Sequence, residues 1–210
     1  MKAPNKKWFF IFFTVIVMLV ACSKRIEKQY IAIQPYVGLK DYLIDSISKA
    51  VKETYGYDVI VFEKIKPPAN AFIHSKTPRY RADTLIRELR KSLPDSIRLI
   101  LGVTPKDISF TKRDAHGNIK KPESRYADWG IFGLGFCPGK SCIVSTFRLS
   151  TNHPEFYNRL KKVAIHEIGH NLGLTHCPDE QCVMTDAAEK ISTIDNVKLS
   201  LCDTCKDLIY

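Results

Sequence analysis

The sequence predicts an α/β domain built on a mixed sheet with crossover helices. Short apolar runs alternate with amphipathic helical stretches, a pattern typical of strands joined by helices. The chain of 210 residues is long enough for one domain with a real core. No internal repeat or low-complexity segment interrupts the alternation.

The first half of the chain supplies the expected elements in order. Residues 31–37 predict a strand, residues 40–55 an amphipathic helix and residues 57–65 a second strand. Pro67 and Pro68 then open a loop. Residues 81–93 repeat the helical spacing, and Pro94 stops that helix.

The second half continues the alternation after a polar interval. Residues 96–103 predict a strongly apolar strand, whereas residues 104–128 predict a surface loop or short hairpin. Residues 129–136 and 142–149 predict two further strands. A helix is expected from Pro154, at a first helical position, to about Leu172.

Within that last helix and just beyond it, the spacing of three histidines suits one metal ion. His166 and His170 are four residues apart, so they project from the same helix face about one turn from each other. Gly173 can adopt positive φ, which would end the helix and turn the chain back, so that His176 can approach as a third ligand. Three ligands leave a fourth position open, as in catalytic zinc sites.

Glu167 lies beside these histidines and is the expected catalytic residue. It can take a proton from a water whose pKa zinc lowers from about 15.7 toward roughly 7. The sequence therefore predicts a zinc hydrolase, with Glu167 as the general base.

The residues after His176 extend the motif. They include Cys177, Cys182, Met184, Cys202 and Cys205. Together with the histidine motif this series resembles the archaemetzincin family of metzincin zinc metallopeptidases. The resemblance implies a metzincin-like mixed sheet, an active-site helix, and Met184 in a Met-turn beneath the catalytic zinc. It also implies that the four cysteines hold a second, structural zinc, which gives two zinc ions per chain and a small zinc-clipped C-terminal subdomain.

Other arrangements of the cysteines remain open at this stage. The four cysteines at 177, 182, 202 and 205 could instead form two disulfides in an oxidising compartment. Cys137 and Cys142 lie outside the family signature and could form a local disulfide or remain two free thiols.

The N-terminal segment predicts export. Lys2, Lys6 and Lys7 precede an apolar run that would span only about 21 Å as a helix, against roughly 30 Å of hydrocarbon. The sequence Leu-Val-Ala-Cys at residues 19–22 resembles a bacterial lipobox, so residues 1–21 are expected to be a lipoprotein signal peptide and Cys22 the acylated residue. An ordinary signal peptide or an uncleaved anchor are the alternatives. The lipoprotein reading implies a bacterial envelope protein, lipid-anchored at a membrane and facing the periplasm or the exterior.

The expected mature chain is one domain behind a short tether. Residues 22–29 form the tether, and residues 30–210 the catalytic domain, divided into an upper part (30–173) and a lower part (174–210). Without Lys2, Lys6 and Lys7, 29 basic residues remain against 22 acidic ones, a charge of +7. The basic residues are scattered and no recognition helix accompanies them, so nucleic acid is not expected as a partner. We expect a monomer.

The expected partner is a peptide or protein substrate. As the resemblance implies, an edge strand before the active-site helix pairs with an extended peptide, and residues 143–148 are the matching run. Two other functions remain open: a catalytically silent, zinc-stabilised binding lipoprotein, and a zinc amidase that acts on cell-wall peptides.

Overall fold

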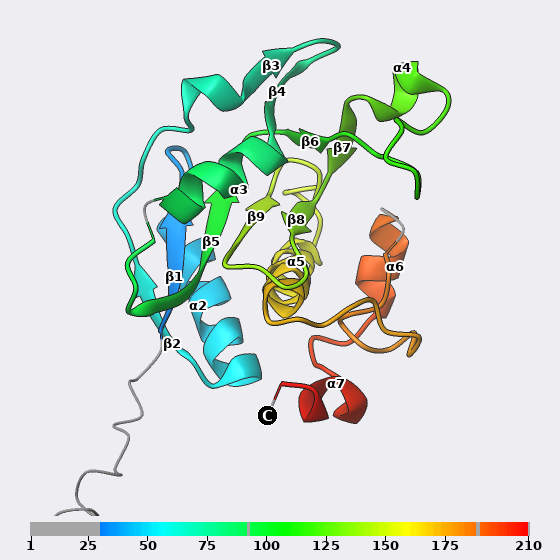
Figure 1. The fold of residues 1–210 in the computed structure, drawn as a ribbon. Coiled ribbons are helices and arrows are strands. Elements are labelled where there is room, and N and C mark those ends of the chain that lie inside the picture. Colours follow the sequence, from blue (N-terminus) through cyan, green and yellow to red (C-terminus); the bar gives the residue numbers. More distant parts are fainter. Residues whose placement is uncertain (1–29, 92, 188–189, 210) are drawn as a thin grey trace, which may run out of the picture.

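The larger of two sheets forms the centre of the molecule (Figure 1). The computed structural model describes residues 30–91, 93–187 and 190–209. The expected signal peptide, the tether and Cys22 lie outside these described residues. The strand order is β2-β1-β5-β9-β8, where the first four strands run parallel and β8 runs antiparallel to β9. The strands are β1 (Tyr30–Pro35), β2 (Asp58–Val61), β5 (Ile97–Thr104), β8 (Gly133–Gly135) and β9 (Ser141–Ser145). The predicted α/β class with a mixed sheet is confirmed.

Helices cover both faces of this sheet. Helices α2 (Asp41–Tyr55) and α5 (Phe156–Asn171) pack on one face, and α3 (Ala82–Lys91) packs on the other. Alternation along β1 explains the two layers, because Ile31 and Ile33 point into the α2–α5 cluster while Ala32 points toward α3. The inner parallel strands β1, β5 and β9 are buried on both faces, as a sheet covered by crossover helices requires.

A smaller sheet, which the sequence did not predict, lies beside the large one. Its order is β3-β4-β6-β7, from β3 (Phe72–His74), β4 (Pro78–Arg81), β6 (Ile108–Phe110) and β7 (Trp129–Ile131), with the short helices η1 (Ala69–Ala71) and α4 (Glu123–Tyr126) near its ends. The expectation that residues 104–128 form a surface loop or hairpin is wrong for β6, whose Ile108 and Ser109 are fully buried. Strands of three or four residues are too short to show a periodicity.

Two predicted strands have different limits in the structure. The expected strand at residues 129–136 divides at Phe132 into β7 and β8, which belong to different sheets. The expected edge strand at residues 143–148 is not an edge, because β9 lies between β5 and β8. Strand β8 pairs antiparallel with β9 on the side away from β5, so β8 is the edge strand next to α5.

The chain after Gly173 packs onto the main core. It contains α6 (Ile191–Asn196) and α7 (Asp203–Asp207). Helix α6 ends at Asn196 because Val197 is extended, with φ −71° and ψ 155°. Buried side chains such as Met184, Ile194 and Leu201 join the cluster under α2 and α5. Among the described residues, no helix is both long and apolar enough to cross a bilayer.

Candidate active site

The end of α5 carries the first three residues of the predicted site. His166, Glu167 and His170 lie in its last two turns, and the helix ends at Asn171. Gly173 has φ +104°, a conformation that favours glycine, and the Leu174 N–H donates a hydrogen bond to the Gly169 carbonyl. This turn directs the following residues back toward the helix, as the sequence predicted.

The turn brings the three histidines together. One ring nitrogen from each of His166, His170 and His176 lies within 4.8 Å of the others, a group that could hold a metal ion. The ring centroids are 4.5, 5.0 and 5.4 Å apart. All three side chains and Glu167 line one cavity of about 310 Å³, which leaves room for a substrate beside the imidazoles.

Backbone carbonyls orient two of the imidazoles. Nδ1 of His166 lies 2.8 Å from the Val183 carbonyl, and Nδ1 of His170 lies 2.8 Å from the Leu174 carbonyl. Because a carbonyl only accepts, each Nδ1 carries the proton and each Nε2 keeps its lone pair. His176 is half exposed, and its Nδ1 lies 3.8 Å from the Asp186 carboxylate.

Burial keeps the two helix imidazoles neutral. Desolvation, with a smaller effect of neighbouring His170, lowers the pKa of His166 to about 4, and desolvation also lowers the pKa of His170. Neutral imidazole is the form that binds metal, so this donor set fits a zinc ion with three nitrogen ligands and one open position.

Glu167 is held between α5 and the edge strand β8. Burial raises the pKa of Glu167 to about 8, and a hydrogen bond from the Gly135 N–H opposes the shift. A Cβ atom at Gly133 would lie 2.7 Å from the Glu167 Cγ, and one at Gly135 would lie 2.6 Å from the Glu167 carbonyl oxygen. The two glycines of β8 therefore leave the space that this carboxylate occupies.

Met184 lies directly beneath the histidine helix and is fully buried. A Cβ at Gly169 would lie 2.4 Å from its sulfur, so the glycine inside the histidine motif allows this approach. The Met184 carbonyl accepts a hydrogen bond from the Cys177 N–H at 2.9 Å. The loop under the site is thereby joined to the cysteine cluster.

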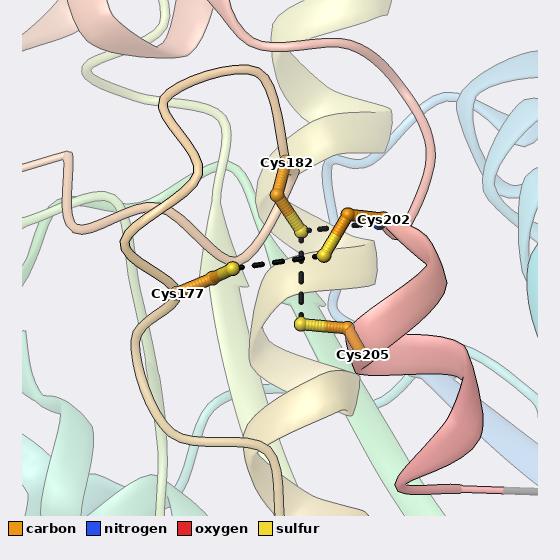
Figure 2. A group of neighbouring side chains, drawn as sticks. All are labelled: Cys177, Cys182, Cys202 and Cys205. Atoms are coloured by element: carbon orange, nitrogen blue, oxygen red, sulfur yellow. Dashed lines mark hydrogen bonds between the residues drawn. The ribbon is translucent and has the colours of Figure 1, made fainter.

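The four C-terminal cysteines converge in this lower part (Figure 2). Their sulfurs lie within 4.8 Å of one another, with 3.7 Å between Cys177 and Cys202 and 3.8 Å between Cys182 and Cys205. A disulfide needs about 2.05 Å, whereas four sulfurs around one zinc, each bonded at about 2.3 Å, stand about 3.8 Å apart. These two spacings match those of a tetrahedral zinc site and are too long for disulfides, so the cluster could hold a metal ion.

Cys137 and Cys142 do not join that cluster. Both are free thiols: Cys137 is exposed and donates to the Leu174 carbonyl at 3.3 Å, and Cys142 is buried in β9. The sequence left open a local disulfide or two free thiols, and the structure has two free thiols.

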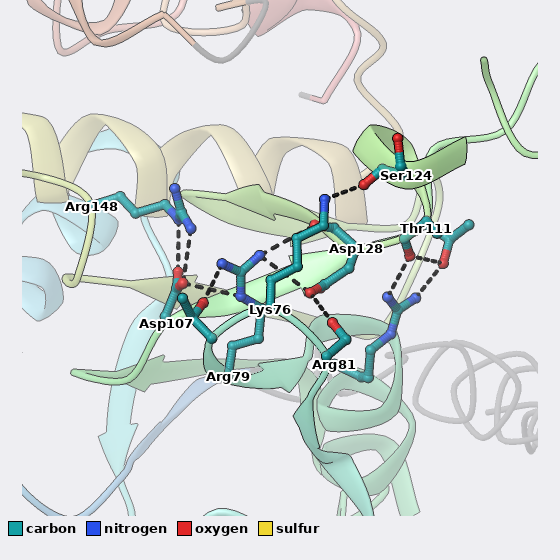
Figure 3. Close-up of polar contacts among 11 residues, drawn as sticks. Lys76, Arg79, Arg81, Asp107, Thr111, Ser124, Asp128 and Arg148 are labelled. Atoms are coloured by element: carbon teal, nitrogen blue, oxygen red, sulfur yellow. Dashed lines mark hydrogen bonds and ion pairs between the residues drawn. The ribbon is translucent and has the colours of Figure 1, made fainter. Parts of the chain in front are cut away.

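A largely buried ionic network lies between the small sheet and the loop after β9 (Figure 3). The Arg148 guanidinium makes two hydrogen bonds to Asp107, at 2.7 and 2.8 Å, and Arg79 lies 3.3 Å from Asp107 and 3.5 Å from Asp128. These residues come from β4, from the turn before β6, from the position just before β7 and from the loop after β9. The network therefore joins the small sheet to the large one.

Sequence reasoning missed several residues of the site. The Gly-Leu-Gly of β8 carried a usable signal, because glycines inside a strand-like run mark a close approach of another segment. Lys112, Lys162 and Asp186 also line the cavity, but nothing in their local sequence distinguishes them from surface residues.

Comparison with known proteins gives one consistent family. The sequence profile described as Peptidase family M54 matches residues 23–210. Among curated proteins, an archaemetzincin of Haloquadratum walsbyi is 31% identical over 173 residues, which cover 78% of this chain and 89% of that protein.

Solved structures agree with this result. The fold is similar to the crystal structure of archaemetzincin from Methanopyrus kandleri, with a TM-score of 0.70, 28% identity, and coverage of 89% of this chain and 96% of that one. It is also similar to an archaemetzincin from Archaeoglobus fulgidus complexed with malonate, with a TM-score of 0.67, 28% identity, and coverage of 86% and 100%.

Proposed function

This chain belongs to peptidase family M54 and is a zinc metallopeptidase, and on that premise we propose which of its residues carry out the hydrolysis. His166, His170 and His176 hold the catalytic zinc, and Glu167 is the general base. The observation that carries this proposal is the convergence of three imidazole nitrogens beside a buried carboxylate in one cavity. When bound, zinc supplies a Lewis acid that polarises the scissile carbonyl and makes water more acidic.

The protein's own groups prepare this site before substrate arrives. The Val183 and Leu174 carbonyls keep the His166 and His170 rings turned with Nε2 toward the common centre. Asp186 acts in the same way on His176, with a looser contact of 3.8 Å. Burial of Glu167 raises the basicity of its carboxylate, which suits it to accept a proton near neutral pH.

Glu167 moves the proton in both halves of the reaction. It takes a proton from the attacking water as the oxygen bonds to the carbonyl carbon. It then gives that proton to the amine nitrogen as the carbon–nitrogen bond breaks. The exposed side of β8 is the edge along which an extended peptide backbone pairs, and this pairing holds the scissile bond across the histidines.

We further propose that Cys177, Cys182, Cys202 and Cys205 hold a second zinc, which makes two per chain. The sulfur spacings support it, as does the contact of Cys177 with the loop of Met184. Zinc bound there stabilises a C-terminal segment whose helices have only six and five residues.

We also propose a lipid anchor at Cys22 that places the enzyme in the bacterial cell envelope. The lipobox-like residues 19–22 support it, and the family match starts at residue 23. Replacement of Cys22 by Ala would move the protein from the membrane fraction to the soluble fraction. Equal membrane content of both forms would contradict the anchor.

The test of the catalytic proposal is Glu167→Gln measured on a mixed peptide library. Turnover should fall at least about a hundredfold, while the zinc content stays unchanged because Glu167 is not a ligand. Glu155→Gln, at the start of the same helix, is the control and should keep full turnover. Hydrolysis by the wild type should also stop with a chelator. Unchanged turnover in Glu167→Gln would show that another group is the base.

A further inference from the structure

A buried lysine lies in the cleft beside the histidines. Lys162 precedes His166 by one helical turn, so both project from the same face of α5, and Lys162 lines the cavity with the three histidines. Only 8% of the residue is exposed. A lysine this deeply buried is uncommon unless something compensates its charge.

Groups within the protein compensate the charge of Lys162 only in part. The Lys162 ammonium donates to the carbonyls of Ile194 and Asp195, each at 2.9 Å. The Asp195 carboxylate is engaged elsewhere, in two hydrogen bonds from Arg159 at 2.6 and 2.7 Å. Among the described residues Lys162 forms no ion pair, and an ammonium has three donors, of which two are used.

The other charges of the cleft do not neutralise this lysine. Glu167 is held against β8 by a hydrogen bond from the Gly135 N–H, and Asp186 contacts the third histidine. The remaining charged side chain of the cavity lining is Lys112, whose Nζ stands 5.0 Å from the Trp129 ring centroid. Near Lys162 the walls are mostly apolar, from Val163, Ile194 and Val197, with Thr193 as a polar neighbour. An anionic group would therefore meet a cation in surroundings that screen charge weakly.

We propose that Lys162 binds a substrate carboxylate in the part of the cleft beside α6. An acidic side chain or the C-terminus of the peptide supplies this carboxylate. This inference rests on the proposed function, because it assigns the substrate class of the same cavity. The apolar walls accept an aliphatic stem, and the third ammonium proton bonds to the carboxylate at its end. Burial lowers the pKa of Lys162, so a bound carboxylate also stabilises the charged lysine.

The test measures binding without turnover. Zinc-loaded Glu167→Gln protein is titrated calorimetrically with two pairs of peptides: one with an internal Glu or the matching Gln, the other with a free or an amidated C-terminus. In at least one of the two pairs, the peptide with the extra carboxylate should bind at least about tenfold more tightly than its neutral partner, since hydrogen bonds between charged groups are strong. The pair that shows the difference identifies the source of the carboxylate. Equal affinities within both pairs would overturn the proposal.

A variant pair assigns the effect to the lysine. Lys162→Met in the same background should remove the preference for the acidic peptide and leave the affinity for the neutral one within about threefold. Lys161→Met changes the preceding residue, which does not line the cavity, and should keep the preference. A preference retained in Lys162→Met would refute the assignment. If Lys162→Met does not fold, as judged by its zinc content and melting temperature, the peptide pairs on the Glu167→Gln background still decide the question.

The two proposals fail separately. A preference for the acidic peptide in a protein whose wild type hydrolyses no peptide would contradict the proposed catalysis and support the carboxylate site. Hydrolysis of peptides without any preference in binding would support the proposed catalysis and contradict the carboxylate site.

Discussion

Gly133 and Glu167 are in direct contact across the boundary between β8 and α5. A Cβ atom at Gly133 would stand 2.7 Å from both Cγ and Oε1 of Glu167. Real Cβ atoms do not come so close to other heavy atoms, so any larger residue at position 133 must displace the carboxylate or the strand. The position of the proposed base therefore depends on a glycine 34 positions earlier in the chain.

Replacement of Gly133 by Ala should lower kcat about a hundredfold, the size expected from a displacement of roughly 1 Å in a catalytic group. The zinc content should not change, because the added methyl group meets Glu167 and not a histidine. Steady-state kinetics and elemental analysis test both statements. Gly56→Ala is the control: its φ of +72° predicts a loss of about 1 kcal/mol in stability, with no change in kcat. A normal kcat in Gly133→Ala would show that the site tolerates the displacement.

Met184→Ala should destabilise the protein by about 2–5 kcal/mol, because it removes a fully buried side chain that packs against Gly169. Met184→Leu keeps most of the volume and should cost less than about 1.5 kcal/mol. Urea denaturation of the zinc-loaded protein measures both values. Equal stability of the two variants would mean that the packing under the helix is not what holds this loop.

Cys205→Ser should lower the zinc content from about two to about one per chain, with the remaining zinc at the histidines. The melting temperature should fall by at least roughly 6 °C, the shift that a loss of about 3 kcal/mol produces in a domain of this size. The control is Cys137→Ser, which changes an exposed thiol outside the cluster and should retain both ions. An unchanged zinc content in Cys205→Ser would exclude the four-cysteine site.

The ion pair of Arg159 with Asp195 should make stability depend on acid pH. The hydrogen bond from Arg159 is the main favourable cause that lowers the pKa of Asp195 in the folded protein. A lowered carboxyl pKa contributes stability above its unfolded value, near pH 3.9, and this contribution is lost as the pH falls through the folded value.

Asp195→Asn should therefore cost about 3 kcal/mol at pH 7, because it leaves the buried Arg159 guanidinium without its anion. The difference from the wild type should shrink as the pH falls below about 4. Denaturation curves across this range give the result. A constant difference at every pH would show that the pair acts through packing and not through charge.

Much of the fold class could be read from local patterns. Strands β1 and β5 and helices α2, α3 and α5 carry longer apolar patterns, so their positions were predicted to within a few residues. The small sheet and the division at Phe132 could not be predicted, because three-residue strands are defined by their partners and not by their own sequence.

The histidine motif and the cysteine series by themselves determined the kind of chemistry. Four-residue spacing on a helix places two imidazoles together through local geometry alone, and a glycine with positive φ returns the third. Only the tertiary structure decided that β8 and not β9 forms the edge of the cleft, that two glycines make room for Glu167, and that Lys162 enters the cavity. Those features depend on contacts between segments far apart in the chain, and such contacts leave no periodic trace in the sequence.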